Sequence, residues 1–311
     1  MTLRIATRRS ALARAQAGQV ADALRQVLGG PVELVPMATT GDEHPDRAIE
    51  SFDAKGLFVD TTRQAVRSGD CDLVVHSYQD LPTEPAPGLV IGAVPRRVDP
   101  RDALVSREGY RLATLPRTRP ATIGTSSARR RAQIQKARRD VLVQPIRGNI
   151  DTRLRRVADG DLDAVVVALA GLLRLGPDLE GLQVVPLEHG ECLHAPAQGA
   201  LALECREDDR ATLDLLAHLD HKPTKLTVTA ERWLLIALGG GCTAPIGAHA
   251  ELLTDSEGRD RLELLGLLSD PNGTRLARAS HQAAPTEPER LGSTLAATLR
   301  DAVGDVRASP S

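Results

Sequence analysis

The fold is decided at residues 3–28, LRIATRRSALARAQAGQVADALRQVL, where a short apolar run is followed by a segment with helical spacing. Leu3–Thr7 has the length and composition of a short buried strand. The apolar residues of Ser10–Leu28 return every three or four positions, at Val20, Leu24 and Val27. We expect this helix to stop at Gly29-Gly30-Pro31, because glycine and proline end helices. A strand followed by a covering helix is the repeating unit of an α/β fold.

The alternation continues well beyond this first unit. Further strands are expected at Val32–Met37, Asp72–Ser77, Leu89–Val94, Thr122–Gly124, Val141–Ile146, Ala164–Ala168 and Ala200–Cys205, and helices at Gly56–Ser68, Ser127–Arg138 and Ile150–Ala158. Strands joined by helices predict mainly parallel sheets with helices on their faces. The remaining residues predict a helix at Thr224–Leu238, strands near Ala248–Leu252 and Leu262–Leu268, and a last helix through Leu291, Leu295, Leu299 and Val303.

Two stretches, Pro95–Arg101 and Leu193–Gln198, are suited to carry the chain between two lobes. We therefore expect an α/β fold of two periplasmic-binding-protein-like lobes with a cleft between them, and a smaller C-terminal α+β domain. The expected first lobe comprises residues 1–97 and 196–217, the second, arginine-rich lobe residues 98–195, and the C-terminal domain residues 218–311. Ligands of such sheets bind at the carboxyl ends of the strands.

The composition excludes several classes of protein. The longest uninterrupted apolar run, Ala164–Leu173, has ten residues, whereas a membrane span needs about 20. The N-terminus lacks the apolar core of a signal peptide, so a cytoplasmic protein is expected. The four cysteines stand far apart without a CxxC pair, which argues against a zinc ribbon or a disulfide scaffold; they are Cys71, Cys192, Cys205 and Cys242.

The charge is unevenly distributed along the chain. It carries 39 basic and 41 acidic residues, for a formal net charge of −2, but residues 117–156 contain twelve Arg and Lys against two acidic residues, Asp140 and Asp151. A strongly basic segment in an otherwise acidic protein favours a local anion site over a general nucleic-acid surface.

Gly124-Thr125-Ser126-Ser127 opens a helix that carries Arg129 and Arg130 in its first turn. Free backbone N–H groups, hydroxyls and guanidinium groups together bind anions, although the same residues also suit a capped helix with a solvated basic face. Arg147 and Arg153, on either side of the next helix start, favour the anion site. Aromatic residues make up only 2% of the chain, too few to stack bases, so a ligand rich in carboxylates is expected in place of nucleic acid.

Three further motifs contain residue types that can carry chemistry. His189, Cys192 and His194 look like a metal cluster, but the H-x2-C-x-H spacing matches no standard zinc pattern, and no metal is expected. Gly239-Gly240-Gly241 lacks the following helix of a dinucleotide-binding fingerprint. Cys242 follows these glycines on a tight loop, which suits a thiol used for covalent attachment, although a cytosolic cysteine is more often a small buried apolar residue.

The chain resembles the porphobilinogen deaminase family, also called hydroxymethylbilane synthases, over nearly its whole length. The matching stretches are Leu3–Ser10, Lys55–Val59, Val75–Ser77, Asp80–Pro82, Asp99–Asp102, Gly124–Arg130, Ile146–Leu154, Ala170–Gly176, Gln198–Ala200, Val228–Arg232 and Gly240–Cys242. So many matches in one order make chance similarity very improbable.

The resemblance implies a transferase of porphyrin and heme biosynthesis. Such enzymes join four porphobilinogen molecules head to tail, with loss of ammonia, and release hydroxymethylbilane. The resemblance also implies a dipyrromethane cofactor, assembled from the substrate and linked through a thioether to Cys242. Each pyrrole carries two carboxylates, which agrees with the density of arginines. A monomer without membrane or nucleic-acid partners is expected.

The resemblance also implies roles for individual residues. Asp80 matches the catalytic carboxylate, which stabilises the positive charge of a pyrrole intermediate and moves protons. The positions that match cofactor-binding residues are Ser77, Gln79, Thr125, Ser127, Arg129 and Arg130. Those that match substrate-binding residues are Arg8, Ser10, Arg147, Arg153 and Arg174.

The sequence departs from the family at a few positions. Gln79 stands where the family has a lysine before the catalytic aspartate, and it keeps hydrogen-bonding capacity without the charge. Ala197 replaces a glycine, Gly239 replaces an acidic residue, and Asp53-Ala54 replaces a glycine pair. Two alternatives therefore stay open: a diverged paralogue that acts on a related pyrrole, and a non-catalytic two-lobed binder of polycarboxylates.

Overall fold

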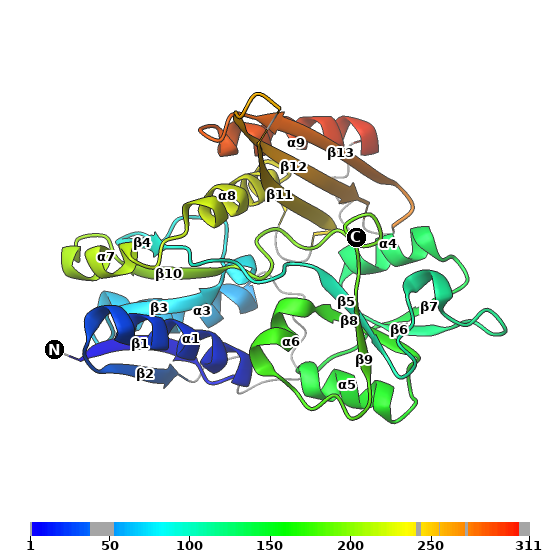
Figure 1. Cartoon of the computed structure of the whole chain (residues 1–311), viewed down its shortest axis with the longest axis horizontal. Coiled ribbons are helices and arrows are strands. Elements are labelled where there is room, and N and C mark those ends of the chain that lie inside the picture. Colours follow the sequence, from blue (N-terminus) through cyan, green and yellow to red (C-terminus); the bar gives the residue numbers. More distant parts are fainter. Residues whose placement is uncertain (1, 38–52, 241–243, 255, 271–272, 305–311) are drawn as a thin grey trace. The chain divides into compact units, whose positions relative to one another are not determined.

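The computed structural model describes residues 2–37, 53–240, 244–254, 256–270 and 273–304 (Figure 1). The chain divides into two compact units, Met1–Val98 with Gly199–Lys225 and Asp99–Gln198 with Leu226–Ser311. Each unit is therefore built from two separate segments of the chain. No helix among the described residues is long and apolar enough to cross a membrane.

The first unit contains a five-stranded sheet in the order β2-β1-β3-β10-β4. Its strands are β1 (Leu3–Arg8), β2 (Val32–Met37), β3 (Leu73–Ser77), β4 (Leu89–Ala93) and β10 (Leu201–Arg206). Strands β1, β2 and β3 run parallel, whereas β10 runs antiparallel to both of its neighbours. Its helices are α1 (Ala11–Leu28), α3 (Asp53–Arg67), α7 (Arg210–Ala217) and the short 3-10 helix η1 (Tyr78–Asp80).

Helix α1 begins and ends where the sequence indicated. Ser10 Oγ accepts a hydrogen bond from the Ala13 N–H at 3.3 Å, which caps the start of the helix. At the other end, Gly29 adopts a left-handed conformation with φ 62°, and its N–H donates to Arg25 O. Glycine takes this conformation without the steric cost of a Cβ atom, so the helix stops there.

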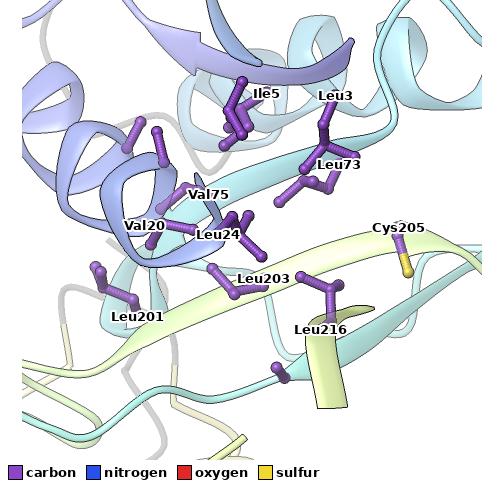
Figure 2. Packing of buried hydrophobic residues seen from close by; sticks show 14 residues of the cluster. Leu3, Ile5, Val20, Leu24, Leu73, Val75, Leu201, Leu203, Cys205 and Leu216 are labelled. Carbon is purple, nitrogen blue, oxygen red and sulfur yellow. The ribbon is translucent and has the colours of Figure 1, made fainter. Parts of the chain in front are cut away.

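The alternation of β1 buries both faces of the first sheet. Leu3 and Ile5 pack in one cluster with Leu24 of α1 (Figure 2). Ala6 belongs to a second cluster that includes Val66 of α3. Successive residues of a strand point to opposite faces, so β1, which has buried side chains on both faces, needs a helix on each side.

The second unit contains a five-stranded sheet in the order β7-β6-β8-β5-β9 and an antiparallel three-stranded sheet in the order β11-β12-β13. The strands are β5 (Asp102–Ser106), β6 (Thr122–Gly124), β7 (Leu142–Gln144), β8 (Ala164–Ala168), β9 (Gln183–Pro186), β11 (Ile246–Thr254), β12 (Asp260–Ser269) and β13 (Leu276–Ala283). The helices are η2 (Leu112–Thr114), α4 (Ala128–Ala137), α5 (Ile150–Ala158), α6 (Leu169–Leu175), α9 (Pro288–Val303) and most of α8 (Lys222–Ala237).

Helices α8 and α9 cover the three-stranded sheet. Leu264 of β12, Leu234 of α8 and Leu295 of α9 are fully buried in one cluster. Gly266 of β12 permits the close approach of both helices, since a Cβ atom there would lie 2.8–2.9 Å from the side chains of Leu295, Leu234 and Leu299. The apolar faces expected from the sequence for α8 and α9 therefore both pack against the three-stranded sheet.

The expected α/β class is confirmed: the chain has two five-stranded sheets with helices, and a smaller C-terminal antiparallel sheet with helices. The two five-stranded sheets are mainly parallel, as expected, because four strands of each run in one direction; β5 and β10 are the exceptions and run antiparallel to both of their neighbours. Each is the first strand after the chain changes unit, at 98–99 and at 198–199, so no crossover helix sets its direction. The boundaries expected for the three domains stay a prediction.

The sequence patterns missed several short elements. Strand β13 has the sequence LARASHQA, in which small and polar residues hide the alternation of a strand. Helix α6 begins directly after β8, inside one apolar run, so periodicity does not separate the two. Strands β5 and β9 and helix α7 were missed as well.

A buried ion pair links three elements of the first unit. Glu204 of β10 accepts hydrogen bonds from Arg63 Nε at 2.8 Å and Nη2 at 2.9 Å, and its Oε2 lies 3.1 Å from His76 Nε2. Burial acts to raise the pKa of Glu204, but the hydrogen bonds from His76 and Arg63 outweigh burial and lower it. The carboxylate is therefore charged, and its charge is compensated inside the unit.

We expect Glu204→Gln to reduce the free energy of unfolding by about 3–5 kcal/mol, because it leaves the buried Arg63 guanidinium without a counter-charge. Chemical denaturation at neutral pH measures this loss. The double variant Arg63→Met/Glu204→Leu removes both charges and should lose much less. A loss below about 1 kcal/mol for Glu204→Gln, the range of an exposed pair, would contradict this role.

Candidate functional site

The carboxyl ends of β1 and β3 bring the first group of expected site residues to one edge of the first sheet. The two strands are parallel neighbours, with Ile5 opposite Leu73. Arg8 is the last residue of β1, and Ser77 is the last residue of β3. Gln79 and Asp80 follow in η1, so they lie just beyond this edge.

Helix η1 holds the Asp80 carboxylate at the surface of the first unit. The turn is anchored at its start, where the Tyr78 N–H donates to Ala200 O at 3.0 Å. It is anchored at its end by Leu81, whose side chain is buried. Asp80 itself is exposed, so the turn orients the carboxylate while leaving it accessible. Ser10 is also exposed, and its hydroxyl caps α1.

In the second unit, hydroxyl groups organise the turn between β6 and α4. The Thr125 hydroxyl accepts from the Ser127 N–H at 3.2 Å, and the Ser127 hydroxyl accepts from the Arg130 N–H at 3.4 Å. Ser126 Oγ donates to Ile146 O at 2.7 Å and accepts from the Ile146 N–H at 3.0 Å, which joins this turn to the end of β7. Ser127 is thus the cap of α4, as the sequence indicated.

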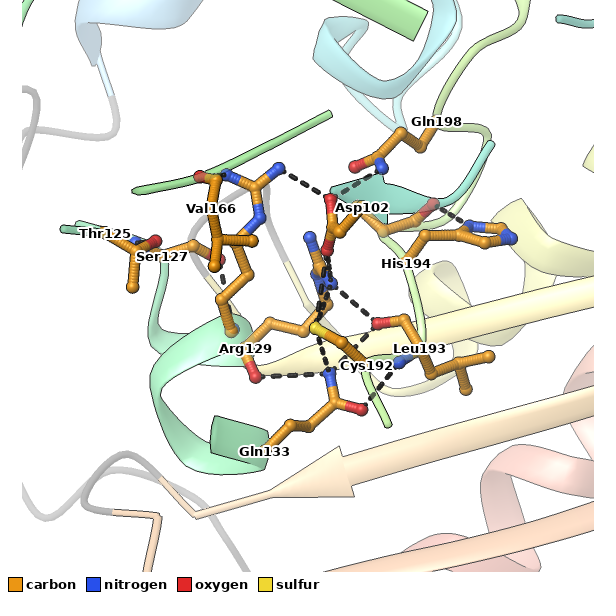
Figure 3. Close-up of polar contacts among 12 residues, drawn as sticks. Asp102, Thr125, Ser127, Arg129, Gln133, Val166, Cys192, Leu193, His194 and Gln198 are labelled. Carbon is orange, nitrogen blue, oxygen red and sulfur yellow. Dashed lines mark hydrogen bonds and ion pairs between the residues drawn. The ribbon is translucent and has the colours of Figure 1, made fainter. Parts of the chain in front are cut away.

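Asp102 of β5 is the centre of a buried charge network (Figure 3). Arg129 Nη1 lies 2.7 Å from its Oδ2, and Arg130 Nη2 lies 2.7 Å from its Oδ1. Gln198 Nε2 donates to the same Oδ1 at 2.8 Å. Burial acts to raise the pKa of Asp102, but the charges of Arg129 and Arg130 outweigh burial and lower the pKa far below its usual range. Asp102 is therefore charged.

Arg129 and Arg130, both expected to bind the cofactor, differ in how their donors are used. Arg129 Nη1 also donates to Leu193 O at 2.6 Å, and the attraction of Asp102 raises the Arg129 pKa despite complete burial. Arg130 Nη1 donates to Val166 O at 3.1 Å, while its Nε has no hydrogen-bond partner among the described residues. Two guanidinium charges share one carboxylate, so one positive charge of this group is not neutralised by Asp102.

Three more arginines add positive charge to the second unit. Burial and then the charge of Arg130 lower the pKa of Arg153, whose Nε donates to Gly148 O at 2.9 Å. Burial lowers the pKa of Arg174 to about 10. Arg147 is exposed. Within the described part of the chain, neither Arg147 nor Arg153 forms an ion pair with a carboxylate. The arrangement is suited to bind an anion.

The sequence grouped Cys192 with His189 and His194, whereas the structure separates the thiol from both rings. Cys192 Sγ points into the Asp102 network, 3.5 Å from Asp102 Oδ2. Burial is the main reason why the pKa of this thiol is raised to about 12. The two imidazole rings instead contact His249 of β11. Burial, with the charges of His249 and Arg101, lowers the pKa of His189 to about 4.

Sequence reasoning missed Asp102, Gln133 and His249. Asp102 stood in a motif that matched the family, but no role was assigned to it. Gln133 Oε1 accepts from the Leu193 N–H at 2.7 Å, and its Nε2 donates to Leu193 O at 3.0 Å. His249 lies 55 residues from its partner His194, so no local pattern could have joined them.

Cys242 lies outside the described residues. The structure describes the chain up to Gly240: after α8, the Gly239 N–H donates to Ile236 O at 2.9 Å and the Gly240 N–H to Leu235 O at 3.0 Å. Gly239 has φ 67°, which favours glycine. The glycines thus close the end of α8 in a tight turn.

We expect Asp102→Asn to reduce the free energy of unfolding by about 3–5 kcal/mol, because the buried Arg129 charge loses its counter-charge while the side-chain shape is kept. Asp161→Asn is the matched control, since Asp161 pairs with Arg156 and both are about half exposed; that pair should contribute at most about 1 kcal/mol. Denaturation by urea compares the two variants. Equal losses of unfolding free energy in the two variants would show that Asp102 does not stabilise the buried network.

Comparisons with known proteins agree with these observations. The family model described as "Porphobilinogen deaminase, dipyromethane cofactor binding domain" matches residues 3–214. The model described as "Porphobilinogen deaminase, C-terminal domain" matches residues 225–301. A porphobilinogen deaminase of Acidothermus cellulolyticus is 46% identical over 307 residues, which are 97% of this chain and 90% of that protein.

Two further relatives have the same name. The porphobilinogen deaminase of Nocardia farcinica is 47% identical over 301 residues, covering 96% of this chain and 85% of the relative. That of Brevibacillus brevis is 42% identical over 307 residues, covering 98% of this chain and 96% of the relative. The matches extend through both units and along nearly the whole chain, and the chain therefore belongs to the porphobilinogen deaminase family.

Proposed function

We propose that the chain is a hydroxymethylbilane synthase, which joins four porphobilinogen molecules head to tail, with loss of ammonia, to give hydroxymethylbilane for porphyrin and heme biosynthesis. The observation that carries the proposal is the match of residues 3–214 to the cofactor-binding domain of porphobilinogen deaminase. No observation favours a diverged paralogue or a non-catalytic binder of polycarboxylates.

The charges of the second unit support binding of pyrrole carboxylates. Arg130 and Arg153 lie close enough for the charge of one to lower the pKa of the other. Two neighbouring guanidinium groups favour binding of an anion, because each binds carboxylate through parallel hydrogen bonds. We assign Arg147, Arg153 and Arg174, with Arg8 and Ser10 of the first unit, to the substrate.

The residues assigned to the dipyrromethane cofactor suit its chemistry. The group carries carboxylates, and when bound it supplies the pyrrole carbon from which the product chain grows. Arg130 has a guanidinium donor that no described residue uses, and the hydroxyls of Thr125 and Ser127 lie at the start of α4. We assign these residues, together with Arg129, Ser77 and Gln79, to hold the cofactor, and Cys242 to link it covalently. Arg129 acts mainly by holding Asp102 and Leu193.

We assign Asp80 as the catalytic carboxylate. Its exposed position on an anchored turn suits a group that must reach a bound pyrrole. A carboxylate next to a pyrrole N–H stabilises the positive charge that develops when ammonia leaves, and it accepts or returns the proton. Gln79, next to it, offers an amide for hydrogen bonds but no charge, so the arginines must supply the attraction for carboxylates. A cytoplasmic monomer without nucleic-acid partners stays part of the proposal.

We expect intact-mass spectrometry of the protein, purified from cells that make porphobilinogen, to show a mass above that of the sequence by two linked pyrrole units. Cys242→Ser should lack this increment, because it removes the sulfur that forms the thioether. A folded wild-type protein without added mass would contradict the assignment of Cys242. Formation of hydroxymethylbilane from porphobilinogen, measured in parallel, tests the activity itself.

We expect Asp80→Asn to keep the covalent cofactor but to lower kcat by about 10²–10⁴-fold, the usual effect of removing a general acid–base group. The substitution removes the charge with little change in shape. Glu84→Gln is the control, since Glu84 is another exposed carboxylate of the same segment, and its activity should be unchanged. Near wild-type turnover by Asp80→Asn would show that another group carries the chemistry.

A further inference from the structure

The imidazoles of His189, His194 and His249 form a cluster that the proposed function does not use. His189 and His194 lie in the segment after β9, and His249 lies in β11 of the three-stranded sheet. One ligand nitrogen from each ring lies within 4.8 Å of the others. The rings of His189 and His249 stack with centroids 3.8 Å apart, and His194 meets them edge-on at 5.3 Å and 5.2 Å.

The hydrogen bonds of His194 indicate which of its ring nitrogens carries the proton and which has a lone pair. His194 Nδ1 lies 2.9 Å from Ala195 O, and a carbonyl accepts only, so Nδ1 carries the proton. His194 Nε2 therefore has a lone pair, and it faces His249 Nδ1 at 3.0 Å. In the metal-free protein one proton lies between these two nitrogens. A metal ion that replaces this proton would receive a lone pair from each ring.

His189 supplies a third nitrogen that no protein group uses. Its Nδ1 is buried and has no hydrogen-bond partner among the described residues, which is unusual for a buried polar atom. Nitrogens around a tetrahedral zinc ion lie about 3.3 Å apart, given Zn–N distances of about 2.0–2.1 Å. Since the ligand nitrogens are already within 4.8 Å, side-chain rotations suffice to reach that spacing.

The backbone around the cluster is held firmly on both sides. The Ala248 N–H donates to His194 O at 2.9 Å, so β11 is bonded directly to the segment that carries His194. The buried Glu231 carboxylate accepts from the Ala197 N–H at 2.7 Å and from the Ala250 N–H at 2.9 Å. Ligands on such a frame lose little freedom when they bind a metal ion.

We propose that His189, His194 and His249 bind a borderline divalent cation such as Zn²⁺, with water in the fourth position. Three imidazoles and an open position are an established zinc donor set, and nitrogen donors disfavour Mg²⁺ and Ca²⁺. His189 and His249 are only partly buried, and His194 is buried. Cys192 is not a ligand, since its thiol lies in the Asp102 network.

Two arginines lie near the cluster. The charge of Arg101 acts on His189, and Arg101 forms ion pairs with Asp99 at 2.8 Å and with Glu188 at 2.7 Å. Arg278 donates to the carbonyl of Gly190 at 2.6 Å. The bound ion would join the segment after β9 to β11. The site would therefore stabilise the attachment of the C-terminal sheet within the second unit.

The experiment is metal titration of the full-length protein with its covalent cofactor, after removal of metals by a chelator. We expect one Zn²⁺ per chain by calorimetry, a higher Tm with Zn²⁺, and intense visible absorption with Co²⁺ that reports tetrahedral nitrogen coordination. His189→Gln is the first variant, because its Nδ1 makes no hydrogen bond that folding requires. It should weaken Zn²⁺ binding by at least about 100-fold, beyond the effect of most outer-shell changes. His249→Gln should do the same.

Two controls separate this site from other metal-binding groups. His218→Gln removes an exposed histidine of the first unit and should leave Zn²⁺ affinity unchanged. Cys242→Ser should bind Zn²⁺ as the wild type does, so the result is independent of the proposed function. The proposal is overturned if wild type binds no stoichiometric Zn²⁺, or if His189→Gln and His249→Gln bind it as tightly as wild type.

Discussion

A carboxylate inside a protein must receive counter-charges and hydrogen bonds, because water no longer solvates it. Asp102 has no exposed surface, and Arg129, Arg130 and Gln198 meet this requirement (Figure 3). The two arginines lie at the start of α4, so their bonds to Asp102 hold that helix against β5. Arg129 also donates a hydrogen bond to Leu193 O. This contact ties α4 to the segment that carries His189 and His194.

The arginines of the basic segment, residues 117–156, form two groups that differ in whether a carboxylate compensates their charge. Some are compensated, such as Arg138, which pairs with Asp140 and donates to Leu112 O. Others, Arg147 and Arg153, find no carboxylate among the described residues. Arg153 is half-buried, so its charge is less screened by water than that of a fully exposed arginine, and it attracts an incoming anion more strongly. The proposed anion site rests on the charges of Arg147 and Arg153 rather than on the total positive charge.

Glu231 has the corresponding role at the C-terminal sheet. It accepts N–H groups from Ala197 and Ala250 with its two oxygens, and it is fully buried. Ala197 has φ 59°, a left-handed conformation that costs an L-residue about 1–2 kcal/mol. The hydrogen bond to Glu231 helps to hold this strained residue, which explains how alanine is accommodated where the family has glycine. The three-stranded sheet and the segment after β9 are thereby one packed structure.

The sequence by itself determined most helices and strands, the family, and the residues expected to carry the chemistry, because apolar periodicity, caps and motif order are local properties. Ser10, Gly29 and Ser127 end or begin helices by contacts within a few residues, so the pattern is sufficient. Only the tertiary structure decided that β5 and β10 are antiparallel, that Arg129 is held by Asp102, and that His249 joins His189 and His194. Each of these depends on groups that the fold brings together from distant segments. Burial determines whether a charge is compensated or exposed. It is a property of the packed chain, so it cannot be read from spacing along the sequence.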